Sequence, residues 1–203
     1  MVDVGAMRER IGVLRLVYDG DARAYRWETE RSVWASAIPD ERINLFSSAG
    51  IGVRGTVFTV RHDAELTLHN AYGWKGKHCF LTAIRTEEPA RGFDTVRAAV
   101  CESVTLTAKP QDRTGRDALN RPTAVEVPGF TFPGVLTEKY FRNDAEDVYR
   151  AELQQRVLVT PKPIALRAGD LVQQDTEPPY TVRQVLDLDP YKNEYVLERR
   201  WDA

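Results

Sequence analysis

The chain has 203 residues, 42% of them apolar and 29% charged, which is enough for one large domain or for two of about 100 residues each. Its 28 Lys and Arg residues against 30 Asp and Glu residues leave a formal net charge of −2. This balance argues against a protein whose main task is to grip nucleic acid, because neutralising phosphates requires a basic surplus.

Alternation of apolar and polar residues predicts β-strands along most of the chain. Within 26–38, for example, Val33, Ala35 and Ala37 share one parity, and polar residues fill most of the other. Strands are predicted over 8–18, 26–38, 53–62, 76–85, 94–102, 103–109, 123–128, 156–160, 180–188 and 193–201. Turn sequences such as Asp19-Gly20-Asp21 separate them, so we expect an all-β fold.

Two segments without clear periodicity predict long loops. Residues 39–52 contain Leu45, Phe46 and Ile51, and residues 128–136 contain Phe130 and Phe132 between prolines and glycines. Apolar residues in such loops either pack under their own domain or are presented to a partner. These five residues are our candidates for a subunit or partner interface.

Residues 143–155 are ambiguous between a helix and a strand. Asn143 followed by Glu146 has the spacing of a helix capping box, whereas residues 151–159 also fit a strand. We therefore expect at most one short helix in the chain.

The order of these features in the first half recurs in the second. Each half has two strands, an irregular loop, a strand, an apolar connection, a glycine-containing turn and two final strands. A repeat of about 100 residues indicates a tandem duplication. We expect two small antiparallel β-barrel or sandwich modules, 1–102 and 103–203, whose edge strands are open to pairing between neighbours.

Four segments of the first half have residue patterns that resemble those of a known protein family. They are Met7-Arg8-Glu9-Arg10-Ile11, Glu28-Thr29-Glu30-Arg31-Ser32-Val33-Trp34-Ala35, Val57-Phe58-Thr59-Val60-Arg61 and Gly76-Lys77-His78-Cys79-Phe80-Leu81-Thr82-Ala83-Ile84. On these segments residues 7–102 resemble the head–tail adaptor, or head-closure (stopper), proteins of tailed bacteriophages and prophages. Residues 103–201 look like a second, more diverged copy.

The resemblance implies a structural virion protein, not an enzyme, that takes no cofactor. Such proteins form a homo-oligomeric ring, here expected to be six- or twelve-fold, that seals the DNA channel at the portal vertex and docks the tail. The implied partners are the portal or adaptor ring on the head side and the tail terminator or tail tube on the tail side. Genomic DNA would pass without specific binding, no membrane is involved, and the location is the virion neck after assembly in the host cytoplasm.

Residues with catalytic or metal-binding chemistry are few. His62, His69, His78, Cys79 and Cys101 match no spacing of a metal site, and none has the local sequence of a nucleophile. We predict no catalytic and no metal-binding residue. Two cysteines favour a reducing compartment, and the chain has neither an apolar segment typical of a signal peptide in 1–12 nor a run of about 18 apolar residues.

Two alternative functions stay open. Aromatic and basic residues interleave at Tyr25-Arg26-Trp27 and around Trp74-Lys75, as in a β-barrel that binds single-stranded nucleic acid or carbohydrate. The other alternative is a tail-terminator protein within the same virion.

Overall fold

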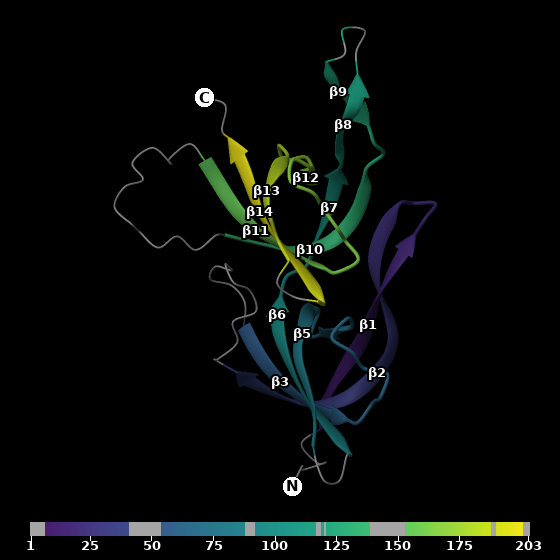
Figure 1. Cartoon of the computed structure of the whole chain (residues 1–203). Helices are drawn as coiled ribbons and strands as arrows, with labels where there is room; N and C mark the ends of the chain where they lie inside the picture. The colour runs from purple at the N-terminus through teal and green to yellow at the C-terminus, as the bar shows by residue number, and fades with distance from the viewer. Residues whose placement is uncertain are drawn as a thin grey trace, which may run out of the picture. The chain divides into compact units, whose positions relative to one another are not determined.

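The computed structural model describes residues 7–40, 54–87, 92–116, 119, 121–138, 153–187 and 190–200 (Figure 1). The fold is all-β, as predicted, and no helix occurs in these ranges. Accordingly, none of the described segments forms a helix able to cross a membrane. The strands are β1 (Glu9–Asp19), β2 (Ala24–Asp40), β3 (Arg54–Arg61), β4 (Ala71–Trp74), β5 (Lys77–Thr86), β6 (Phe93–Cys101), β7 (Val104–Lys109), β8 (Gln111–Arg116), β9 (Pro122–Glu126), β10 (Phe130–Glu138), β11 (Leu153–Pro161), β12 (Leu171–Gln174), β13 (Tyr180–Leu186) and β14 (Lys192–Arg200).

The chain divides into two compact units. The first comprises Met1–Val17 and Trp27–Ser103, and the second comprises Tyr18–Arg26 and Val104–Ala203. The main division therefore falls one residue from the sequence boundary at 102/103. The assignment of Tyr18–Arg26, the tip of the β1–β2 hairpin, to the second unit was not expected from the sequence.

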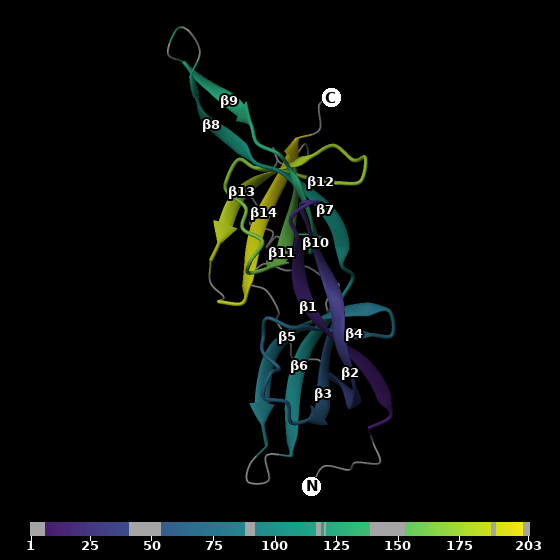
Figure 2. The same cartoon turned by 90° about the vertical axis from the view of Figure 1, so that its right-hand side faces the viewer.

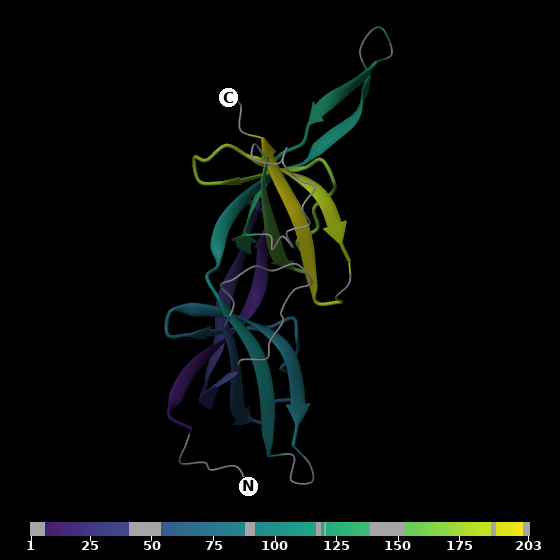
Figure 3. The ribbon, with the colours of Figure 1, turned by 90° about the vertical axis from the view of Figure 1, so that its left-hand side faces the viewer.

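Each unit contains a closed six-stranded barrel. In the first, the strands follow the order β1-β4-β5-β6-β3-β2, and β2 pairs with β1. In the second, the order is β7-β12-β13-β14-β11-β10, and β10 pairs with β7. Replacing each strand of the first barrel by its counterpart in chain order reproduces the second, so the two units share one topology (Figures 2 and 3).

Irregularities of the backbone recur at equivalent places in the two barrels. The β5–β6 register shifts between Leu81 and Ala83, and the β13–β14 register shifts between Val182 and Gln184. Lys75 and Asp175 directly follow β4 and β12. Both have a positive φ, 51° and 47° respectively, which is typical of a left-handed turn residue. A β-bulge and a left-handed turn are specific features, and their repetition supports a common origin of the two units.

The connection between the third and fourth strands of each barrel is closed by the same hydrogen bonds. In the first unit, the Thr67 amide donates to Asn70 Oδ1 (2.9 Å), and the Asn70 amide donates to the Thr67 carbonyl (3.1 Å). In the second, the Arg167 amide donates to Asp170 Oδ2 (2.7 Å), and the Asp170 amide donates to the Arg167 carbonyl (3.1 Å). Asn and Asp favour such turns because their side chains bond the nearby backbone.

The interior of each barrel is filled by side chains. In the first unit the core consists of Ile11, Val13, Ala35, Phe58, Val60, Leu66, Tyr72, Cys79, Leu81, Val96, Ala98 and Val100. In the second unit the buried apolar residues include Leu106, Phe132, Leu158, Ile164, Val172, Tyr180, Tyr195 and Leu197.

Two expectations from the sequence are wrong, and one ambiguity is resolved. Residues 130–138 form strand β10 and not a loop. Of the helix and the strand that the sequence left open for 143–155, residues 153–155 belong to strand β11. Residues 143–152 lie outside the described part of the chain. The expected open barrel edges are absent from the described strands, because pairing closes each six-stranded sheet on itself; the β8–β9 hairpin forms a separate two-stranded sheet.

Candidate interaction surfaces

The β1–β2 hairpin tip brings aromatic side chains together within the second unit. The ring centroids of Tyr18 and Tyr25 are 4.6 Å apart, those of Tyr25 and Phe130 are 6.0 Å apart, and those of Phe130 and Phe132 are 5.7 Å apart. Offset or edge-on aromatic pairs at these distances are stabilising beyond the area that they bury. Tyr18 at the outer end of the row remains 50% exposed, whereas Phe132 at the inner end is fully buried.

Polar contacts hold the tip in place on the same unit. The Thr131 amide donates to the Arg23 carbonyl (3.0 Å), next to a parallel bridge between Ala24 and Thr131. The Tyr25 hydroxyl donates to the Pro163 carbonyl (3.3 Å), and burial raises the pKa of Tyr25. The tip thus docks through one backbone bond, one side-chain bond and an aromatic row.

The turn of the tip is closed by Asp19. Its Oδ1 accepts hydrogen bonds from the amides of Asp21 (3.1 Å) and Ala22 (3.0 Å), and its Oδ2 accepts one from Arg26 Nη1 (2.9 Å). The bond from Ala22 and the one from Arg26 lower the pKa of Asp19. The tip is therefore a preformed turn.

These contacts involve two of the five predicted interface residues, Phe130 and Phe132. Phe130 is half-buried and already faces Tyr25 of the tip, and Phe132 belongs to the core of the second barrel. Phe132 is therefore unable to meet a partner without unfolding of β10. Leu45, Phe46 and Ile51 lie outside the described residues.

Strand β2 carries an apolar pair that the interface prediction missed. Trp34 and Ile38 are 59% and 60% exposed, and they lie four residues apart on the outward face of the strand. The neighbouring Val33, Ala35 and Ala37 turn inward, as their shared parity predicted. The same alternation, applied to the other parity, would have pointed to Trp34 and Ile38.

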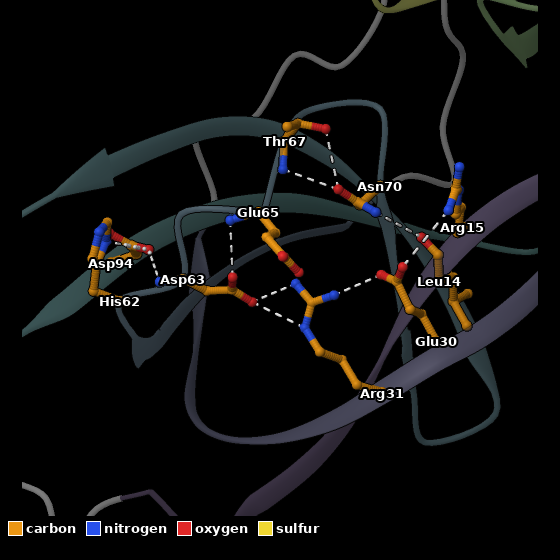
Figure 4. A network of polar contacts seen from close by, with 10 residues as sticks. All are labelled: Leu14, Arg15, Glu30, Arg31, His62, Asp63, Glu65, Thr67, Asn70 and Asp94. Atoms are coloured by element: carbon orange, nitrogen blue, oxygen red, sulfur yellow. Dashed lines mark hydrogen bonds and ion pairs between the residues drawn. The ribbon is translucent and has the colours of Figure 1, made fainter.

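A network of charged side chains covers part of the first barrel (Figure 4). Arg31 on β2 donates from Nε to Asp63 Oδ2 (3.0 Å), makes a second bond from Nη2 to the same oxygen, and donates from Nη1 to Glu30 Oε2 (2.6 Å). Arg15 on β1 lies 4.0 Å from Glu30 Oε1. Burial acts to raise the pKa of Asp63, but the bonds from Arg31 and from the Glu65 amide outweigh it and lower that pKa.

His62 and Asp94 form the other end of this network. His62 Nδ1 lies 2.9 Å from Asp94 Oδ1, and the Asp63 amide donates to Asp94 Oδ2 (3.1 Å). Asp94 is only 1% exposed, and both of its carboxylate oxygens have a hydrogen-bond partner, as buried polar atoms usually do. This arrangement anchors the connection that follows β3.

Three further titratable side chains of the first unit are buried, namely those of Cys79, Cys101 and His78. Burial raises the pKa of Cys79 and of Cys101 to about 12, and burial lowers the pKa of His78 to about 4. Thiols of such high pKa are poor nucleophiles at neutral pH. Among the described residues, no group of three or more His, Cys, Asp or Glu side chains is arranged to hold a metal ion.

Comparisons with protein-family models, with curated proteins and with solved structures give no match for this chain.

Proposed function

We propose that the chain is a structural, non-enzymatic virion protein that forms a homo-oligomeric head–tail connector ring at the portal vertex of a tailed phage. In this role it seals the DNA channel as a head-closure or adaptor protein and docks the tail. The proposal rests on the resemblance of residues 7–102 to such proteins and on one observation from the structure. That observation is a duplicated closed six-stranded barrel in which, in each copy, the first strand along the chain pairs with the second and closes the barrel.

This architecture suits assembly better than chemistry. Closed barrels leave no edge for uncontrolled pairing, so contacts between subunits are directed to hairpins, to loops and to outer faces. The outward Trp34 and Ile38 add an apolar surface of the kind that interfaces bury. A formal net charge of −2 fits a conduit through which DNA passes without being held.

The oligomeric state of the purified chain tests this proposal. Size-exclusion chromatography with light scattering should give a particle several times heavier than the 23.0 kDa chain, and electron microscopy should show it as a ring. Mixing with portal rings or portal–adaptor complexes should produce a stable co-complex. A chain that stays monomeric and binds neither would refute the proposal, and a salt-sensitive gel shift with single-stranded DNA would favour the nucleic-acid-binding alternative.

A further inference from the structure

The β8–β9 hairpin differs from all other described strands in how it is paired. Every strand of the two barrels pairs with another strand on each side. β8 and β9 pair only with each other among the described strands, and they project from the second barrel (Figures 1–3). Each of the two therefore has one edge along which no described strand pairs with its backbone N–H and C=O groups, and such an edge is a template for another strand.

The outer edge of β9 can accept a further strand. Its proline, Pro122, stands at the first position of the strand, opposite Arg116, where a missing amide hydrogen is best tolerated. Residues 123–126 each have a backbone N–H group, and Thr123 and Val125 are β-branched, as is typical of strands. The sequence of β9 therefore leaves most of its edge able to pair.

The backbone of β8 carries an irregularity that favours curvature. Asp112 is opposite Val125 and Gly115 is opposite Thr123, so β8 has one residue more than β9 over this interval. An extra residue of this kind bends a strand and increases its twist. Bent and twisted strands close a sheet into a barrel, whereas flat edges pair without limit. A sheet built from such hairpins is therefore expected to close on itself.

A second copy of the hairpin is the partner that fits these edges. Both barrels of another copy are closed, so among its described strands only β8 and β9 offer a whole unpaired edge. The sequence 111–126 contains three arginines against two aspartates and one glutamate, so its net charge is zero and two copies do not repel each other. An isolated two-stranded hairpin is only marginally stable in water, and further strands stabilise it.

We propose that β9 of one copy pairs antiparallel with β8 of the next copy, so that the hairpins of successive copies form one continuous sheet. The contact joins two different edges, so repeating it adds subunits head to tail, and it closes into a ring when the rotation per subunit allows. This inference rests on the proposed function, because it assigns the subunit contact of the same ring.

The position of the hairpin tips follows from this pairing. β8 and β9 are antiparallel, so alternation of β8 and β9 along the sheet places all tips on the same side. Neighbouring tips are then two strand spacings, or about 10 Å, apart. Pairing of β9 with β9 of a second copy would instead be two-fold symmetric and would place the two tips at opposite ends of a four-stranded sheet. The distance between tips therefore distinguishes the two arrangements.

Spin labels on the full-length chain measure this distance. Leu119, between β8 and β9, is 69% exposed, and Leu119→Cys can be labelled selectively because Cys79 and Cys101 are buried. The electron paramagnetic resonance spectrum of the associated chain should show dipolar broadening from labels about 10 Å apart, and excess unlabelled chain should remove it. Arg183→Cys, on β13 of the same unit with its side chain 73% exposed, is the matched control and should give a narrow spectrum.

A hairpin-replacement variant gives a second measurement. A short Gly-Ser linker in place of residues 111–126 should raise the concentration needed for association, measured by sedimentation velocity, by about tenfold or more. If that variant fails to fold, the spin labels alone decide.

The outcomes separate the contact from the ring. Broadening at position 119 alone supports the contact. Associated chains with a narrow spectrum at position 119, broadening at both positions, or a folded replacement variant that associates as the original chain does would overturn the contact and leave the ring proposal standing. A chain that is monomeric at every concentration would overturn both.

Discussion

The buried His78 predicts an acid-sensitive first unit. His78 is 8% exposed, its ring lies 5.0 Å from that of Trp27 and 4.7 Å from that of Phe80, and its buried Nε2 has no hydrogen-bond partner among the described residues. Burial lowers its pKa from 6.5 to about 4. Since the unfolded chain binds this proton more readily, the stabilising effect is complete above pH 6.5 and is lost as the pH falls toward 4.

The size of this effect follows from the pKa difference. A difference of 6.5 − 4 = 2.5 units corresponds to about 3 kcal/mol in total, of which about 2 kcal/mol is lost between pH 6.5 and 4.5. His78→Phe keeps an aromatic ring in the apolar cluster and removes the titrating group. The variant should therefore lose about 2 kcal/mol less stability than the original chain over this pH range.

Urea unfolding followed by tryptophan fluorescence measures this difference. Three of the four tryptophans, Trp27, Trp34 and Trp74, belong to the first unit, so in a background that carries Trp201→Phe the signal reports on the barrel that contains His78. His69→Gln, which removes an exposed histidine from the same unit, is the matched control and should follow the original chain. Parallel losses of stability in the original chain and in His78→Phe would refute the reasoning.

Three further predictions concern the two barrels. Cys79 and Cys101 should resist iodoacetamide at pH 8 in the folded chain and react in urea, as followed by mass spectrometry, because burial raises the pKa of each to about 12; rapid labelling of the folded chain would contradict their burial. Phe132→Ala should cost about 3–5 kcal/mol of unfolding free energy in denaturant titration, whereas a loss below about 1 kcal/mol would mean that the residue is not in the core. Asn70→Ala and Asp170→Ala should each cost about 1–2 kcal/mol by calorimetry or urea unfolding, with the greater loss for the buried Asp170; unchanged stability in both would show that the turn closures are dispensable.

Sequence periodicity predicted the long strands because one face of each is buried. In β7, for example, Leu106 and Ala108 point into the barrel, as their alternation with Thr105 and Thr107 indicated. The short strands β4 and β12 were missed, since four residues are too few to show an alternation. They become strands by pairing with longer neighbours on both sides.

Strand β10 was missed for a different reason. Its Pro133 and Gly134 are typical of loops, yet both pair with β7. Gly134 lies in a crowded place: a Cβ atom there would be 2.8 Å from Leu158 Cδ1 and 3.1 Å from Leu106 Cδ1, so both leucine side chains would have to shift. Only the folded barrel reveals that this glycine makes room for two leucines.

The residues of the candidate surfaces could be predicted only in part from the sequence. The outward parity of β2 places Trp34 and Ile38 at the surface, and this alternation is visible in the residues alone. By contrast, the Arg31–Asp63 pair joins residues 32 positions apart, and the contact of Tyr25 with the Pro163 carbonyl joins residues 138 positions apart. Local patterns contain no information about such contacts, because they depend on how the strands are ordered in the barrel.

The mass of the assembled chain in solution tests the central claim most directly. We expect light scattering at near-neutral pH and low salt to give a closed particle whose mass is a six- or twelve-fold multiple of 23.0 kDa. A particle of 23.0 kDa at every concentration, with or without portal rings, would contradict the account.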